Sequence, residues 1–133
     1  MIRKFHEAKT RNAKGVTVWG SGNPYREFLY VNDLADACIF LMNLAEDTPP
    51  SLPPSSPLIN IGTGEDITIK DLAEMVKGIV GFEGEIEWDR TKPDGTPRKL
   101  LDVSKIKALG WKPKTGLEEG IRRTYEWYKE LTS

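Results

Sequence analysis

The residues best suited to acid–base or nucleophilic chemistry are the only histidine, His6, and the only cysteine, Cys38. Cys38 lies within a segment that is almost entirely apolar, where a thiol usually serves as inert packing. A single cysteine excludes an internal disulfide framework and a cysteine-rich zinc site, and a single histidine excludes a multi-histidine metal site. We therefore expect no metal site in this chain.

Glycine-rich turns and a Tyr-x-x-x-Lys spacing are the next candidates for chemistry. The turn Gly20–Gly22 follows a predicted strand but leads into another strand, so no helix N-terminus would face a phosphate. Gly62–Gly64 precedes a predicted helix but lacks the third glycine of a dinucleotide-binding turn. Tyr125 is followed by Lys129 at the right spacing, but it belongs to the apolar stripe of the last predicted helix. We interpret both turns and this tyrosine as structural.

The remaining candidates suit ligand binding. Trp19 offers a flat face at the end of a strand, and Arg26, which follows a glycine-rich turn, can pair two phosphate oxygens at once. Lys4 lies on the opening helix, while Asp94 and Lys99 lie in a basic loop. A diphosphate needs cations, and a purine or sugar needs a flat face and a carboxylate. On residue types alone, structural roles are favoured, with Trp19 as a half-buried strand aromatic and Asp94 as a turn former before glycine.

Hydrophobic periodicity and capping residues predict the elements that position these side chains. The expected helices are an opening segment that ends at 12–15, then 33–46, 68–78, 104–110 and a last helix from 115, and the expected strands are 16–19, 27–31, 58–61 and 85–88. Expected caps are Asn32 or Asp33, Ser104, and the capping boxes that open at Thr68 and Thr115. Turn chemistry marks residues 20–24, and proline marks loops at 48–57 and 89–101.

The predicted helix 33–46 has almost no polar face. A helix that is apolar all round is normally buried all round, and a domain of 133 residues has little room to bury one in this way. We therefore expect that part of this helix meets a partner that the chain does not contain.

Composition limits the class of protein. The 133 residues suit one domain, and 38% hydrophobic with 29% charged residues exclude a disordered tail. No apolar run approaches the roughly 20 residues that cross a bilayer, and the first residues do not read as a secretory signal. The net charge of −1 gives no bulk attraction to nucleic acid or to a membrane surface. We expect a cytoplasmic α/β protein whose basic stretch 89–114 suits a small anionic ligand.

The segment 18–37, VWGSGNPYREFLYVNDLADA, resembles the extended short-chain dehydrogenase family, which acts on nucleotide sugars. The resemblance rests on an Arg-acid-Phe strand at Arg26–Phe28 and on a helix start at Val31–Ala35. Asn60–Gly62 followed by Ile67–Ile69 matches a later strand-turn-helix of the family. Many epimerases and dehydratases share these motifs, so they indicate only the superfamily.

Three further stretches are more specific. KPDGTPRKLLD at 92–102, WGSGNP at 19–24 and RKFHEA at 3–8 resemble the GDP-L-fucose synthases, which are GDP-4-keto-6-deoxy-D-mannose 3,5-epimerase-4-reductases. The resemblance covers essentially the whole chain but only the C-terminal part of that family. It implies that 1–133 is a single C-terminal nucleotide-sugar-binding domain, with 48–57 as a proline-rich loop and the N-terminal Rossmann half absent.

The resemblance also implies a reaction. These enzymes epimerise C3 and C5 of the keto sugar and then reduce C4 with NADPH. Their Ser-Tyr-Lys set, epimerising Cys and His, and NADP glycine loop belong to the N-terminal half and have no matching positions here. The resemblance therefore implies no catalytic and no cofactor-binding residue in this chain, with NADP on the absent Rossmann half. It also implies a homodimer for the full-length enzyme.

The substrate contacts that the resemblance implies are Lys4, Trp19, Arg26 and Asp94, with Lys99 as a weaker candidate. The basic pair Lys4 and Arg26 would offset the diphosphate charge, Trp19 would give an apolar or stacking contact, and Asp94 would accept hydrogen bonds from guanine N–H groups or ribose hydroxyls. The alternatives are a stand-alone binding or interaction module and a fragment of another nucleotide-sugar epimerase or dehydratase.

Overall fold

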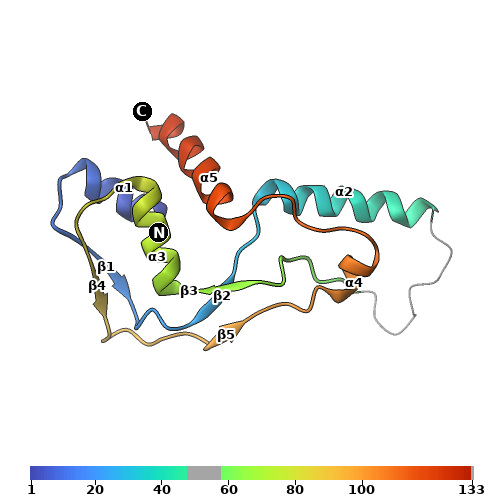
Figure 1. Cartoon of the computed structure of the whole chain (residues 1–133), viewed down its shortest axis with the longest axis horizontal. Coiled ribbons are helices and arrows are strands. Elements are labelled where there is room, and N and C mark those ends of the chain that lie inside the picture. Colours follow the sequence, from blue (N-terminus) through green and yellow to red (C-terminus); the bar gives the residue numbers. More distant parts are fainter. Residues whose placement is uncertain (48–57, 133) are drawn as a thin grey trace.

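The computed structural model describes residues 1–47 and 58–132, so the proline-rich loop predicted at 48–57 lies outside the described residues. The described part is elongated, with α1, α3, β1 and β4 at one end, α2 and α4 at the other, and β2, β3 and β5 between them (Figure 1). The elements are α1 (Ile2–Thr10), β1 (Gly15–Trp19), β2 (Tyr25–Glu27), α2 (Val31–Asp47), β3 (Asp66–Thr68), α3 (Ile69–Val80), β4 (Glu85–Asp89), β5 (Arg98–Lys99), α4 (Ser104–Ala108) and α5 (Leu117–Thr132).

The end that contains β1 and β4 has a closed hydrophobic core. These two strands pair in parallel, with Val16 opposite Ile86 and Val18 opposite Trp88. The apolar sides of α1, α3 and α5 contribute the rest of the core, and Phe5 at its centre is fully buried. The strand pattern at 16–19 and the apolar spacing of the three helices predict these elements but not how they pack, and the α/β class is confirmed.

A second, smaller core lies at the other end of the molecule, between α2 and α4. Its buried residues are Ala37, Val103, Ile106 and Trp111, and Ile59 and Ile61 are partly buried against them. Only one side of α2 faces this core. Val31, Ile39 and Met42 on the helix are 66%, 60% and 71% exposed, so the apolar excess predicted for this helix remains on its surface.

Between the two cores runs a sheet of three short strands, in the order β3-β2-β5. The central strand β2 pairs antiparallel with β3 and in parallel with β5. Neither β3 nor β5 is predicted from the sequence, because strands of three and two residues are too short to show a period.

The predicted strand 27–31 is wrong in its boundaries. The strand is Tyr25–Glu27, because the Tyr25 N–H donates to the Pro97 carbonyl and Tyr25 and Arg26 pair with the short strand β5. Helix α2 begins at Val31, where the carbonyl of Tyr30 accepts the Leu34 N–H, so neither Asn32 nor Asp33 caps it.

The predicted strand 58–61 does not form in the structure. A strand needs a neighbour to pair its backbone groups, and no strand in the described ranges pairs with this segment. The side chains of Ile59 and Ile61 pack on the second core, and the Asn60 side-chain amide donates to the Asp102 carbonyl over 3.1 Å. The apolar pattern therefore reports burial here and not a strand.

Of the four expected caps, only Thr68 is confirmed. Thr68 caps α3, accepting the Asp71 N–H at 3.0 Å. Ser104 is the first residue of α4, with Val103 at the cap position, and its N–H donates to Asp102. The Thr115 hydroxyl donates to Asp33, an acceptor far away in the sequence.

Candidate functional site

Trp19 is the centre of the first group of predicted site residues. It is the last residue of β1, and its side chain is 66% exposed. The Nζ of Lys4, on α1, lies 5.7 Å from the centroid of the Trp19 ring and donates to the Thr17 carbonyl. A second ammonium group, Nζ of Lys92, lies at the same distance from the same ring. Two cations therefore lie near one exposed indole.

Asp94 joins this group through the turn that follows β1. One carboxylate oxygen accepts the Ser21 N–H at 2.8 Å, and the other accepts the Ser21 hydroxyl at 2.6 Å. The hydroxyl bond, followed by the backbone bond, holds the pKa of the Asp94 carboxyl below its ordinary value. Gly20 allows this approach, because with φ of +86° a Cβ would lie 2.4 Å from an Asp94 oxygen. The carboxylate is thus ionised and oriented.

Arg26 and Lys99 form the second group. They are paired residues of β2 and β5, so their side chains lie on the same face of the sheet. The Arg26 guanidinium donates to the Tyr25 carbonyl, and a Cβ on Gly95 would lie 3.0 Å from its Nη2 atom. Since Gly95 follows Asp94, this places Arg26 against the loop that carries Asp94. The five predicted residues are therefore successive neighbours along one edge of the molecule.

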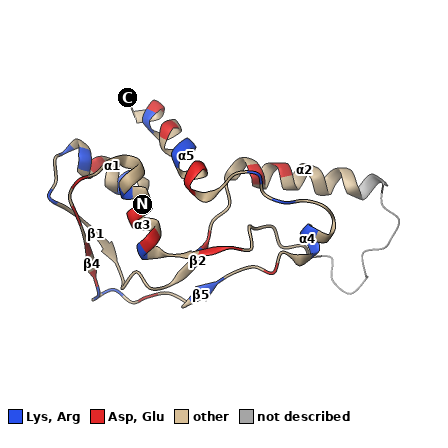
Figure 2. Ribbon diagram, viewed as in Figure 1, with Lys and Arg blue, Asp and Glu red and all other residues tan. Residues whose placement is uncertain are grey.

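The basic residues of 89–114 follow this edge. Figure 2 shows Lys and Arg recurring from the end of β4 to β5 and on to α4. Arg98 is not available to a ligand in the same way, because it forms two hydrogen bonds with Asp66 of 2.6 and 3.1 Å. Arg26 and Lys99, which form no ion pair within the described residues, are therefore better candidates for contact with an anionic ligand than Arg98.

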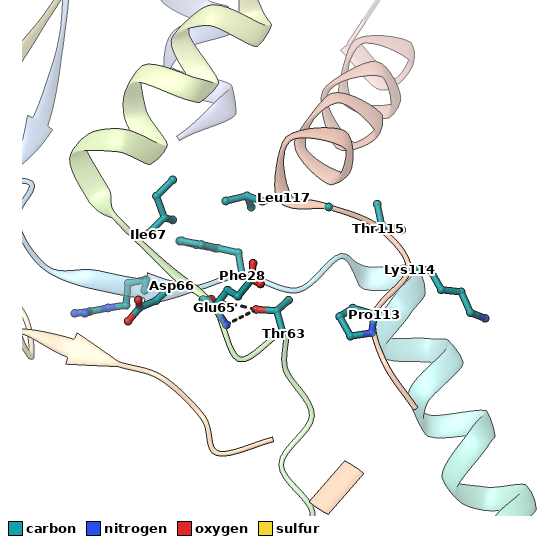
Figure 3. A pocket seen from close by; sticks show the side chains of 11 residues that line it. Phe28, Thr63, Glu65, Asp66, Ile67, Pro113, Lys114, Thr115 and Leu117 are labelled. Carbon is teal, nitrogen blue, oxygen red and sulfur yellow. Dashed lines mark hydrogen bonds between the residues drawn. The ribbon is translucent and has the colours of Figure 1, made fainter. Parts of the chain in front are cut away.

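Arg26 also lines a hollow of about 400 Å³. Phe28, Ile67 and Leu117 lie on one side of it, and the segment before α5 lies on the other (Figure 3). Lys114 in that segment points away, and its Nζ lies 3.1 Å from Asp36. The hollow therefore has an apolar wall beside a guanidinium.

Glu27, the acid of the Arg-acid-Phe motif, has a structural role that the sequence analysis missed. Its carboxylate accepts the N–H groups of Gly64 at 2.7 Å and Leu101 at 3.0 Å, and the Thr63 hydroxyl at 3.2 Å. Burial alone would raise the pKa of Glu27, but these hydrogen bonds outweigh it and lower the pKa. The carboxylate thereby joins β2 to two loops. The three donors that bind Glu27 come from distant segments, so the sequence around Glu27 gives no sign of these hydrogen bonds.

Asp33, in the helix-start motif, is also structural. Asp33 is only 5% exposed, and its carboxylate accepts hydrogen bonds from the N–H groups of Lys114 and Thr115 at 3.1 and 2.8 Å. One turn later, Asp36 accepts the Trp111 indole N–H at 3.0 Å and contacts Lys114. The indole bond, followed by the Lys114 bond, lowers the pKa of Asp36. Both acids hold the segment 111–115 against α2.

The remaining candidates for chemistry lie away from this edge. His6 Nδ1 is 3.2 Å from the Tyr125 hydroxyl, and Tyr125 is buried in the first core. Cys38, which we expected to be inert packing inside its helix, is exposed, because it lies on a side of α2 that the described residues leave uncovered. In the part of the chain that the structure describes, no group of three or more His, Cys, Asp or Glu residues could hold a metal ion. None of the described helices is long and apolar enough to cross a membrane.

Comparison with known proteins supports the resemblance inferred from the motifs. Residues 1–62 match the NAD dependent epimerase/dehydratase family. Over 98% of its length the chain is 55% identical to a putative GDP-L-fucose synthase 2 of Arabidopsis thaliana and 49% identical to the GDP-L-fucose synthase of Escherichia coli strain K12. A solved GDP-mannoheptose C4 reductase from Campylobacter jejuni with NADP bound is 43% identical and superposes over 96% of this chain with a TM-score of 0.83.

The chain is therefore strongly homologous to the GDP-L-fucose synthases, and the resemblance carried by its motifs is confirmed. The chain spans only 37% of the Arabidopsis protein, 41% of the Escherichia coli protein and 43% of the Campylobacter chain.

Proposed function

We propose that this chain is the GDP-sugar-binding, C-terminal part of an NADPH-dependent epimerase and reductase that makes GDP-L-fucose from GDP-4-keto-6-deoxy-D-mannose. In this proposal, residues 1–133 act as one nucleotide-sugar-binding unit. The observation that carries it is the edge on which Lys4, Trp19, Asp94, Arg26 and Lys99 follow one another. Homology to GDP-L-fucose synthases over 98% of the chain supports GDP as the nucleotide.

The side chains on this edge complement a nucleoside diphosphate sugar. Lys4 and Arg26 supply the positive charge that a diphosphate needs, and Trp19 offers an exposed ring for stacking. A carboxylate has about four acceptor positions, and Asp94 uses two of them on Ser21. The other two remain for ribose hydroxyls or guanine N–H groups. Lys99, exposed on the short strand β5, would add a weaker contact.

The reacting residues and the NADP site belong, in this proposal, to a part of the full-length enzyme that the chain does not contain. Two observations support this. The imidazole Nδ1 of His6 lies 3.2 Å from the hydroxyl of Tyr125, a core residue, and Cys38 is an exposed residue of α2, a helix that carries none of the five ligand candidates. The exposed apolar side of α2 then fits against the nucleotide-binding half.

Calorimetric titration of GDP into the purified chain tests the binding site. We expect Arg26→Ala to weaken GDP binding by roughly ten- to a hundredfold, since loss of a charge-assisted hydrogen bond costs about 1.5–3 kcal/mol. Lys99→Ala should cost less, because the Lys99 side chain is exposed and must be ordered by the ligand, whereas Arg26 is half-buried and held by the Tyr25 carbonyl and Gly95.

Arg11→Ala, which removes an exposed arginine at the end of α1, is the matched control and should bind GDP as the parent does. If Arg26→Ala binds GDP like the parent while Lys99→Ala does not, the assignment of the diphosphate contact is wrong. The purified chain should neither bind NADPH nor form GDP-L-fucose. Product formation would contradict the placement of the reacting residues elsewhere.

A further inference from the structure

The loop between β4 and β5, residues 90–97, is exposed over almost its whole length but is fixed at two points. At its start, Asp89 accepts the N–H and the hydroxyl of Thr91, and the Asp89 carbonyl accepts the Lys92 N–H at 3.2 Å. Further on, Asp94 forms its two hydrogen bonds with Ser21. Lys92 therefore lies between two fixed points on a loop that would otherwise be free to move.

Both fixed points are connected to β1 or to the turn that follows it. Asp89 is paired with Trp19 in the parallel sheet, and its carbonyl also accepts the Gly20 N–H at 3.0 Å. Ser21, the acceptor of the Asn23 N–H and the donor to Asp94, is two residues after Trp19. Hydrogen bonds therefore hold the loop against the end of β1 that carries Trp19. This places the Lys92 ammonium group near the Trp19 ring.

Two ammonium groups lie near the same exposed ring at this place. Lys4 and Lys92 each lie 5.7 Å from one ring centroid, and neither forms an ion pair with a carboxylate in the described ranges 1–47 and 58–132. Like charges repel, and an anion that contacts both ammonium groups beside the ring would relieve that repulsion. Asp94 is close by but is engaged with Ser21.

We propose that Lys92 is a further ligand-binding residue that, with Lys4, holds the diphosphate of the nucleotide beside Trp19, and that Ser21 is the positioning residue that holds the loop through Asp94. This inference rests on the proposed function, because it takes the diphosphate as the anion. It assigns Asp94 a second task, since the carboxylate both faces the ligand and keeps Lys92 in place.

Four variants test it by GDP titration at several salt concentrations and by hydrogen exchange of residues 90–99. Lys92→Ala should bind GDP about three- to tenfold more weakly and with a flatter salt dependence, while its affinity for guanosine, which has no phosphate, should not change. Lys14→Ala removes the same charge at the opposite end of β1 and should bind GDP as the parent does. Ser21→Ala should exchange faster at 90–99 and bind GDP more weakly, and Ser21→Thr, which keeps the hydroxyl, should restore both.

The outcomes separate this inference from the proposed function. If the parent binds GDP and Lys92→Ala binds it equally well at every salt concentration, the role of Lys92 is overturned and the proposed function stands. If the parent does not bind GDP, the proposed function and the role of Lys92 fail together. In either case, Ser21→Ala with parental exchange at 90–99 overturns the positioning role, and faster exchange supports it.

Discussion

The two ends of this molecule differ in how completely their apolar residues are buried. At the end built on β1 and β4, the apolar sides of α1, α3 and α5 meet in one core around Phe5. At the other end, α2 has apolar residues on both sides, but the described residues cover only one of them, so Val31, Ile39 and Met42 remain exposed. The core around Phe5 is buried by the chain's own helices, whereas an exposed apolar helix side is typical of an interaction surface.

Core truncation should separate the two ends most clearly. We expect Phe5→Ala to lower the free energy of unfolding by about 3–5 kcal/mol, because it removes a fully buried ring and leaves a cavity. Ile39→Ala removes an exposed side chain and should change it by less than about 0.5 kcal/mol. Urea unfolding monitored by circular dichroism measures both. Equal losses would show that the α2 side is covered in the isolated chain and would break the comparison.

The contact between α2 and the segment 111–115 gives the next largest effect. Asp33→Asn should lower the free energy of unfolding by about 2–3 kcal/mol, because the side-chain oxygens of Asp33 accept three hydrogen bonds at a buried position and the amide keeps only one of these oxygens. Asp36→Asn, one turn along on a more exposed side chain, should cost less. Amide exchange at Lys114 and Thr115 should become faster in the Asp33 variant. Unchanged exchange there would remove the argument that this acid is structural.

The exposed side of α2 should make the isolated chain self-associate or bind a hydrophobic dye. We expect Ile39→Lys with Met42→Lys to reduce both, since they place charge on that surface. Leu131→Lys, at a similarly exposed apolar position on α5, is the control and should have little effect. Sedimentation and dye fluorescence are the measurements. A parent chain that stays monomeric and dye-silent at high concentration would contradict the exposed-interface interpretation.

The smallest expected effect is on pH dependence. The hydrogen bonds to Glu27 outweigh burial and place its pKa in the fold below the ordinary value of 4.5. This stabilisation is complete above pH 4.5 and is lost as the pH falls through the lower pKa of the folded state. Glu27→Gln should therefore be less stable than the parent at neutral pH and should lose less stability on acidification. Parallel acid dependence of parent and variant, measured by urea unfolding, would contradict this account.

Local patterns were sufficient where an element depends on its own residues. Thr68 with Asp71 predicts the start of α3, and the spacing of Phe5 and Ala8 predicts the buried side of α1. The motifs at 3–8, 18–37 and 92–102 indicated the homologous family, which is confirmed, and contain the five ligand candidates, which stay predictions.

Tertiary structure alone decided which long-range partner each polar group has. Nothing in the local sequence pairs Ser21 with Asp94, Glu27 with Gly64 and Leu101, or Asp33 with Thr115. The same holds for 58–61, whose strand-like pattern has no neighbouring strand in the described residues, and for β5, which exists only beside β2. Periodicity and capping are short-range properties of the chain, whereas a hydrogen bond or a strand pair also needs a second segment. Where that segment lies depends on how the whole chain packs.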